Sequence, residues 1–396
     1  MKKLAIVAMA AMLVLAGCGG ADEGTSEDLP RGITADTIAI GSHTDLSGGL
    51  AIWGVPANNG QRMRYDEVNA AGGIHGRKID FIVEDSQYQV PIAVKAANKL
   101  LNVNNVFLMV GNMGTPMNNA IMPRMFEANV PNLFPISGAV QMYEPLHPMK
   151  FSYFVSYRDQ ARAGIAYMTE KYQIKKICLQ ALATEYGAEA ENGFNQAVEE
   201  LGLEVAYVGH HKASETDFTG TVTGIKNSGC ELLVLGPFVK DTIQIYSAAR
   251  DTGWDAPILG NMVSYVPEVA AAGDGRTEGL YAVASFYMPP FNVAPEGSWV
   301  AQWYAKYLEL FNEEPAAQSI IGYVIADLTV RALEGAGPDV TVEKVLAALE
   351  KIENYEDPFG GPSLTFSPTK HQGGDYLYLY QVRDGKWEIV DEEIPF

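Results

Sequence analysis

The sequence predicts an α/β fold built from two Rossmann-like lobes, each with a parallel sheet flanked by helices. Short β-rich runs alternate with longer helical runs from Thr37 onward, and such alternation is typical of parallel sheets covered by helices on both faces. The same scheme repeats in the second half of the chain, from Lys176. Residues 33–396 also exceed what a single hydrophobic core usually organises, so two lobes are expected.

The strands of the first lobe are expected at residues 38–40, 79–83 and 106–110. The last of these runs is apolar throughout, as expected of a strand that is covered on both faces. A helix-compatible stretch follows the first strand and ends at Gly72-Gly73, because glycine tolerates the left-handed conformation that stops a helix. The next helix is expected at residues 92–101.

The second lobe should contain strands at residues 176–179, 205–208 and 232–235. A helix before them has a core stripe spaced by four, three and four residues: Ala161, Ile165, Met168 and Tyr172. Three later helices suggest that the chain then returns to the first lobe; they are expected at 299–311, 319–333 and 342–352. The β-rich stretch at 376–382 would cross over again.

We therefore expect three hinge crossovers, near Phe154, Ala284 and Leu379. The expected boundaries give lobe 1 residues 33–153 and 285–378, and lobe 2 residues 154–284 and 379–396. In open α/β sheets, ligands bind at the carboxyl ends of the strands, and clefts between domains are favoured ligand sites. The sequence thus predicts a ligand site between the lobes.

Residues 1–18 have the features of a lipoprotein signal peptide. Two lysines precede an apolar run at 4–17, which is too short for a membrane-spanning helix of about 20 residues. The run ends in a Leu-Ala-Gly-Cys sequence that resembles the bacterial lipobox and implies cleavage before Cys18 and acylation of its thiol. The alternative is an ordinary signal peptide that happens to contain a cysteine.

Residues 19–32 contain almost no large apolar side chain, so they are expected to form a flexible tether. Two or three acyl chains on Cys18 would anchor the protein stably, where a single chain would not. The expected location is therefore extracytoplasmic and membrane-anchored, in the periplasm or on the outer face of the cell membrane.

The charge of the chain limits its partners. Forty-eight acidic residues against 28 basic ones give a formal net charge of −20, which argues against nucleic acid or anionic lipid as a partner. Apart from Cys18, the cysteines are Cys178 and Cys230. They could form a disulfide in an oxidising compartment or remain two buried free thiols, and the sequence leaves both possibilities open.

The sequence contains no convincing catalytic signature, such as a Gly-x-Ser-x-Gly elbow, a Walker A loop or a His-Glu-x-x-His helix. His210-His211 is better explained as a surface turn than as a metal site. Glu84-Asp85 is better explained as a capping pair than as an acid–base pair. We therefore expect no enzyme activity, no metal and no cofactor. A hydrolase with dispersed catalytic residues stays as an alternative.

Three motifs stand out in the first lobe: Asp45-Leu46-Ser47-Gly48, Trp53-Gly54 and Asn69-Ala70-Ala71-Gly72-Gly73-Ile74-His75-Gly76-Arg77. They resemble those of the hydrophobic and branched-chain amino-acid binding proteins of bacterial ABC importers. The likeness covers residues 38–387. It implies the type I periplasmic binding protein fold and an ABC permease as partner. It also implies a ligand enclosed by hinge motion, namely a hydrophobic or branched-chain amino acid or a related small carboxylate or amide. A ligand-sensing module for a signalling partner would share the same pocket and is the second alternative.

The resemblance also implies which first-lobe residues bind the ligand. Thr115, which opens a helix, would hold a ligand carboxylate through its hydroxyl and N–H, with Asn112 and Gly114 beside it. A plain N-cap would use the same side chain. After the next strand, Ile136, Ser137 and Gly138 would offer a carbonyl and a hydroxyl. Ser137 is displaced by one position from the threonine that is more common in the family.

Aromatic side chains are implied to enclose the ligand, namely Trp53 from lobe 1 and Tyr186 and Phe238 from lobe 2. A role in the lobe cores is the alternative for each. Met262 stands where family members usually carry an acid that pairs with the ligand's ammonium. Burying an ammonium without a counter-charge is costly, so this position favours as ligand a carboxylate or amide with an apolar or aromatic body. Asp159 could restore the missing charge.

Overall fold

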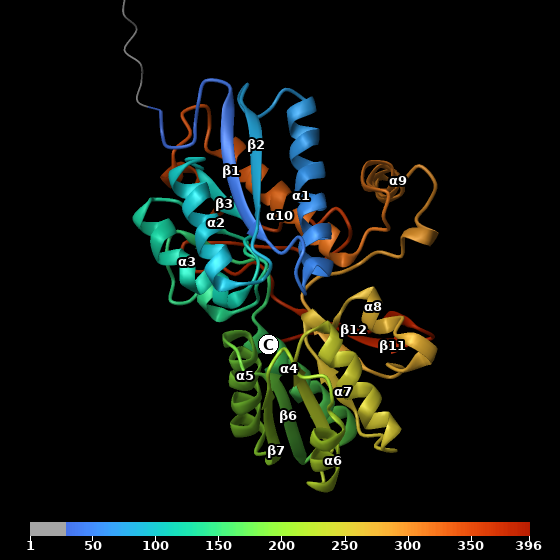
Figure 1. Ribbon diagram of the computed structural model, residues 1–396. Helices are drawn as coiled ribbons and strands as arrows, with labels where there is room; N and C mark the ends of the chain where they lie inside the picture. The colour runs from blue at the N-terminus through green and yellow to red at the C-terminus, as the bar shows by residue number, and fades with distance from the viewer. Residues whose placement is uncertain (1–28) are drawn as a thin grey trace, which may run out of the picture.

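The computed structural model describes residues 29–396, which form two α/β lobes joined at the ends that face each other (Figure 1). The signal peptide expected at 1–18 and the tether up to residue 28 lie outside the described residues. Arg31 Nε donates a hydrogen bond to the carbonyl oxygen of Val106, so the folded part already includes the last tether residues. Within residues 29–396, no helix combines the length and the hydropathy that a membrane crossing requires.

Lobe 1 contains a five-stranded sheet in the order β2-β1-β3-β4-β5, with every pair parallel. Its strands are β1 (Thr37–Thr44), β2 (Lys78–Asp85), β3 (Leu108–Val110), β4 (Asn132–Leu133) and β5 (Lys150–Phe151). Its helices are α1 (Ala51–Ala70), α2 (Val90–Asn102), α3 (Thr115–Glu127), α9 (Trp299–Phe311), α10 (Ala317–Gly335) and α11 (Val342–Leu349). The whole run 106–110 is buried, as expected, although only its last three residues pair as a strand.

The late helices belong to lobe 1 because α10 packs closely against α1 (Figure 1). Two glycines allow this approach. A Cβ on Gly60 would lie 1.9 Å from the carbonyl oxygen of Ser319, and one on Gly322 would lie 2.0 Å from that of Ala57. The return of the chain to the first lobe, which the sequence predicted, thus depends on backbone contact between two helices distant in sequence.

Lobe 2 contains a seven-stranded sheet in the order β12-β11-β10-β9-β8-β6-β7. Its strands are β6 (Lys176–Leu182), β7 (Glu204–His211), β8 (Leu232–Gly236), β9 (Ile258–Gly260), β10 (Tyr281–Ala284), β11 (Leu377–Arg383) and β12 (Lys386–Ile394). Its helices are α4 (Tyr157–Tyr172), α5 (Glu185–Leu201), α6 (Thr219–Asn227), α7 (Val239–Asp251) and α8 (Pro267–Ala270). In α4, the predicted stripe is buried except at its end, where Tyr172 is 43% exposed.

The second sheet departs from the prediction of parallel strands, because β11 runs antiparallel to both β10 and β12. A tight turn through Asp384 (φ 49°) and Gly385 (φ 70°) joins β11 to β12. Positive φ at both central residues is the geometry that suits a two-residue hairpin. The chain end therefore adds an antiparallel edge to an otherwise parallel sheet.

The chain passes between the lobes three times. The first pass follows Phe151 of β5, and the second follows Ala284 of β10. Gln372 still pairs with Ser152 in lobe 1, whereas β11 has begun in lobe 2 at Leu377. The third pass therefore lies between Gln372 and Leu377, before the expected position at Leu379.

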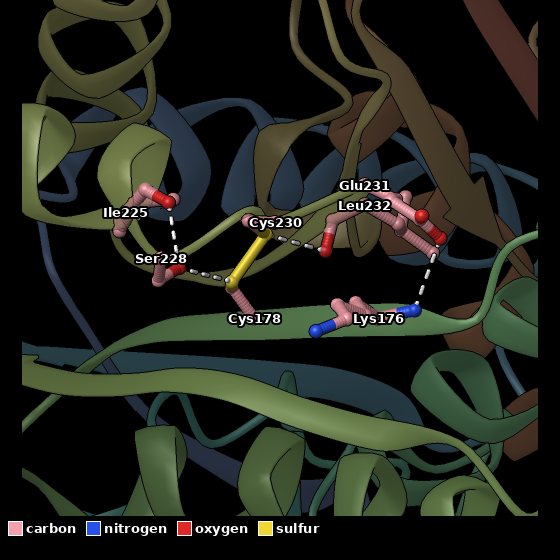
Figure 2. The surroundings of a disulfide bond; sticks show 7 residues. All are labelled: Lys176, Cys178, Ile225, Ser228, Cys230, Glu231 and Leu232. Carbon is pink, nitrogen blue, oxygen red and sulfur yellow. Dashed lines mark hydrogen bonds between the residues drawn. A yellow bond between two sulfur atoms is a disulfide. The ribbon is translucent and has the colours of Figure 1, made fainter.

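A disulfide joins Cys178 of β6 to Cys230, which lies just before β8 (Figure 2). This answers the question that the sequence left open. The two cysteines are 52 residues apart, so the bond closes a loop that contains α5, β7 and α6. Glu231, next to Cys230, accepts a hydrogen bond from the N–H of Lys176, which fastens β6 to the same turn (Figure 2).

A buried carboxyl group in lobe 1 should make stability depend on pH. Asp357 is 7% exposed, and only one of its oxygens has a partner, the N–H of Phe359 at 2.8 Å. Burial, followed by the nearby charge of Asp327, raises the pKa of Asp357 to about 7. The folded protein thus retains a proton that the unfolded chain, with a pKa near 3.8, has already released.

This difference stabilises the fold most below pH 4, and the contribution is lost as pH rises to about 7. Asp357→Asn keeps the shape and removes the titration. We expect the free energy of unfolding, measured with urea, to fall for the parent by on the order of a few kcal/mol across this pH range. The variant should show no such fall. Parallel profiles for the two proteins would contradict the assignment.

Candidate ligand-binding site between the lobes

A cavity lies between the lobes and is lined almost entirely by apolar and aromatic side chains. The space open to the centre of a water molecule is about 20 Å³, roughly enough for a single water. Lobe 1 contributes Leu50, Trp53, Tyr88, Met113, Gly114 and Ile136, and lobe 2 contributes Tyr157, Tyr186, Phe238 and Val263. The side chains of the two lobes therefore already lie close together across the cleft.

The lining residues follow the carboxyl ends of strands, as the rule for open α/β sheets requires. Trp53 lies at the start of α1 after β1, and Gly114 comes directly before α3, after β3. In lobe 2, Tyr186 begins α5 after β6, and Phe238 precedes α7 after β8. The two sheets thus direct their carboxyl ends at one cavity.

The aromatic rings form a cage. Tyr186 stacks on Phe238 with ring centres 5.8 Å apart and meets Tyr157 edge-on at 4.9 Å. Tyr88 contacts Phe238 edge-on at 5.4 Å and so joins the lobes. Burial raises the pKa of Tyr157 and of Tyr186, so both phenols are neutral and can donate hydrogen bonds.

Half of the predicted site residues line this cavity: Trp53, Gly114, Ile136, Tyr186 and Phe238. Asn112 has a different environment. Its Oδ1 accepts from the N–H of His43 at 3.1 Å, and its Nδ2 donates to Asn132 at 2.8 Å. It therefore links the ends of strands β1, β3 and β4 beneath the site.

Thr115 and Ser137 are buried beside the lining, next in sequence to Gly114 and Ile136. Their hydroxyl oxygens lie 2.8 Å apart, and Ser137 Oγ also accepts from the N–H of Ala139. When Thr115 donates to Ser137, the proton of Ser137 remains free to donate, because a hydroxyl accepts two bonds and donates one. The pair thus keeps one donor for a further partner.

Met262 and Gly138 form a close contact between the lobes. Met262 is buried, and its N–H donates to Gln160 Oε1 at 3.0 Å. A Cβ on Gly138 would lie 3.3 Å from the terminal methyl of Met262 and 3.1 Å from the ring of Tyr157. An apolar methyl group therefore lies beside the cage at the position where the resemblance implies an acid.

Sequence reasoning missed five lining residues: Leu50, Tyr88, Met113, Tyr157 and Val263. Tyr88 follows β2 by three residues, and Tyr157 begins α4 directly after the first crossing. An aromatic residue beyond a strand end is the signal that could have found these two tyrosines. The aliphatic residues Leu50, Met113 and Val263 carry no such signal.

The buried acids near the cavity already have partners. Asp45 accepts from the N–H groups of Gly48 and Leu50, at 2.5 and 2.8 Å. Asp159 accepts from Ser156 Oγ at 2.5 Å and pairs with Arg158 at 3.2 Å, so it does not supply a free charge. Among residues 29–396, no carboxylate lines the cavity.

Polar contacts from α5 also connect the lobes. Glu189, which is 2% exposed, accepts from the N–H of Val140 at 3.0 Å and from Gln141 Nε2 at 2.9 Å. Glu185 accepts from the side-chain amide of Asn119 in α3, which faces α5 across the cleft (Figure 1). Lobe 2 carboxylates and lobe 1 amides thus hold one side of the cleft together.

Glu84-Asp85 and His210-His211, the two other pairs considered from the sequence, each contain a residue bonded to neighbouring protein groups. Asp85 accepts from the hydroxyl of Ser47 and from the N–H groups of Leu46 and Gln87, which lowers its pKa. It therefore fixes the turn after β2, but it does not cap the next helix, α2, as the sequence suggested. The surface-turn explanation for the histidines is wrong for His211, which is buried in β7 and lies 3.3 Å from Asp241. No group of three metal-ligating side chains occurs in the described part of the chain.

The fold and the cleft define a class of protein that comparison with known families confirms. A family model described as periplasmic binding protein matches residues 37–386. The chain therefore belongs to the periplasmic binding proteins, and its fold is the type I fold of its structural neighbours.

Relatives by sequence and by structure agree on this family. A leucine-, isoleucine-, valine-, threonine- and alanine-binding protein of Pseudomonas aeruginosa is 23% identical, covering 83% of this chain and 86% of its own. A fatty acid ABC transporter substrate-binding protein from Thermomonospora curvata has a TM-score of 0.82 at 24% identity, covering 93% and 95%. A branched-chain amino-acid transporter binding protein from Streptococcus pneumoniae, in complex with isoleucine, has a TM-score of 0.76 at 23% identity, covering 90% and 99%.

Proposed function

We propose that this protein is the extracytoplasmic substrate-binding lipoprotein of an ABC importer. Its ligand is a small carboxylate or amide with an apolar or aromatic body, enclosed between the lobes. The observation that carries the proposal is the cavity lining, which combines aromatic rings from both lobes with no ionised side chain of residues 29–396. Aromatic and aliphatic walls with a few polar groups are typical of small-molecule sites.

The relatives support transport and leave two ligand types open. Their names refer to branched-chain amino acids and to fatty acids, both of which carry a carboxylate on an apolar body. The α-ammonium is the group that distinguishes them. The apolar methyl of Met262 and the engaged carboxylate of Asp159 favour a ligand without that ammonium.

The carboxylate or carbonyl end of the ligand is assigned to Thr115 and Ser137. Thr115→Ala or Ser137→Ala should weaken the binding of 3-phenylpropionate by about 1–3 kcal/mol, because a charged group loses a buried donor. Isothermal calorimetry measures the change, and Thr115→Ser, which keeps the hydroxyl, is the control. An unchanged Kd for both alanine variants, with folding intact, would exclude this assignment.

The lipid anchor is assigned to Cys18, on the short apolar run that precedes it. We expect the native protein to begin at Cys18 and to carry acyl chains, and to leave the membrane fraction when Cys18 is replaced by serine. Mass spectrometry of the N-terminal peptide measures this directly. An unmodified N-terminus at another residue would contradict it.

A further inference from the structure

Tyr88 lines the cavity, and residues close to it in the chain line a wider groove. The groove, of about 740 Å³, is lined by residues adjoining those of the cavity: Val90 and Pro116 in lobe 1, and Leu182 to Glu185, Ala188, Glu191 and His210 in lobe 2. Val90 is two residues from Tyr88, and Pro116 is two residues from Gly114. The same chain segments therefore line both spaces.

The ring of Tyr88 contacts both lobes at the cavity. It contacts Phe238 of lobe 2 edge-on. A Cβ on Gly114 would lie 2.8 Å from Cε2 of Tyr88, so the ring covers the backbone of Gly114 in lobe 1. Tyr88 is half-buried, as expected of a side chain with the cavity on one side and solvent on the other.

The backbone that carries Tyr88 is strained. Gln87 and Tyr88 have φ values of 50° and 51°, a conformation that costs about 1–2 kcal/mol per residue for side chains other than glycine. Strain of this kind persists where the surroundings enforce it, and it is concentrated at ligand clamps and active sites. The two residues thus adopt a turn that their own preferences do not favour.

Neighbouring groups hold this turn in place. Asp85 Oδ1 accepts from the N–H of Gln87 at 2.9 Å, and the Ser86 carbonyl accepts from the N–H of Gln89 at 2.9 Å. A Cβ on Gly48 would lie 2.7 Å from the carbonyl oxygen of Gln87, so the first-strand loop packs against the turn as well. Tyr88 is therefore a fixed wall of the cavity and has little freedom to retreat from a larger ligand.

From this geometry we propose that Tyr88 determines specificity by limiting the length of the ligand. Its ring separates the inner cavity from the outer groove and excludes carboxylates whose apolar tail would have to continue into the groove. The inference rests on the proposed function and narrows it: the ligand is a short apolar or aromatic carboxylate, not a long-chain fatty acid.

The test compares straight-chain carboxylates from butanoate to decanoate, and 3-phenylpropionate, by calorimetry on the full-length protein. The parent should bind the short acids and reject decanoate. In Tyr88→Ala each further methylene can enter the groove, and because a buried methylene is worth about fourfold in affinity, decanoate should gain at least about tenfold. Tyr88→Phe, which keeps the ring, should bind the carboxylates with the same order of affinities as the parent.

Tyr88→Gly is the second variant, since glycine accepts the positive φ and should relieve strain while removing the ring. Tyr172→Ala, at an exposed tyrosine at the end of α4, is the matched control and should not alter the preference for length. The inference is overturned if the ring-deleted variants keep the parent's length profile, or if the parent binds decanoate as tightly as hexanoate.

A separate readout distinguishes failure of the inference from failure of the proposed function. If the parent binds no carboxylate, the proposed function is wrong. Binding of the apolar dye ANS then tests, without any carboxylate ligand, whether the Tyr88 ring separates the cavity from the groove. Tyr88→Gly should raise ANS fluorescence several-fold over the parent and over Tyr88→Phe, because cavity and groove become continuous. Equal fluorescence of the three proteins would overturn the inference.

Discussion

Removing the α-ammonium from phenylalanine, to give 3-phenylpropionate, is expected to strengthen binding by at least about a hundredfold, or about 2.7 kcal/mol. The ammonium would enter a cavity whose lining has no carboxylate among residues 29–396. Asp159 is paired with Arg158, and Glu189 is engaged by an N–H and an amide. A buried charge without a free partner loses its hydration and gains little in return.

Calorimetry on the two compounds measures the difference, and Met262 supplies the control. Met262→Glu would place a carboxylate beside Gly138 and Tyr157 and should shift the preference toward phenylalanine. Met262→Gln, with the same length and no charge, should not. If the parent protein preferred the amino acid by a hundredfold, a counter-charge must exist, and our interpretation of Met262 would be wrong.

Loss of the disulfide should destabilise the fold by about 4 kcal/mol, the loop-closure estimate for a loop of this length. The bond joins Cys178 to Cys230 across 52 residues of lobe 2, so the unfolded chain gains considerable freedom without it. Urea unfolding of a double variant, Cys178→Ser with Cys230→Ser, should show a lower midpoint than the parent. Both proteins should carry Cys18→Ser so that no other thiol is present.

Reduction with dithiothreitol distinguishes the effect of losing the disulfide from the effect of the serine substitutions. It should lower the midpoint of the parent toward that of the double variant and leave the variant unchanged. Thiol titration of the unfolded, unreduced parent should find no free thiol. Two free thiols would show that the pair exists as separate buried cysteines.

The fold was predictable because its signals are local. The apolar run at 106–110 and the stripe through Ala161, Ile165 and Met168 follow from the periods of strands and helices. The two-residue strand β4 was too short to give such a period. The antiparallel edge depends on how β11 pairs with β10, which is a property of the assembled sheet.

The candidate site was less predictable, because its geometry depends on contacts between the lobes. Thr115 and Ser137 were named separately, and only the structure brings their hydroxyls within 2.8 Å. Tyr88 carries no motif. Its position results from a turn that Asp85 and Gly48 enforce from other segments. Local residue preference argues against that turn, so its backbone conformation could not be predicted, although the position of Tyr88 just beyond β2 could have marked it as a candidate.

The contacts between α5 and lobe 1 also bear on how the cleft responds to salt. Dissolved ions weaken the attraction between opposite charges, and they do so most at exposed sites. Glu185 and Glu189 contact amides and an N–H group rather than cations. The attraction is between a charge and a dipole at hydrogen-bond distance, and the carboxylate of Glu189 is shielded from solvent. Closure of the lobes on this side should therefore change little with ionic strength, which suits a protein that meets a medium of varying composition.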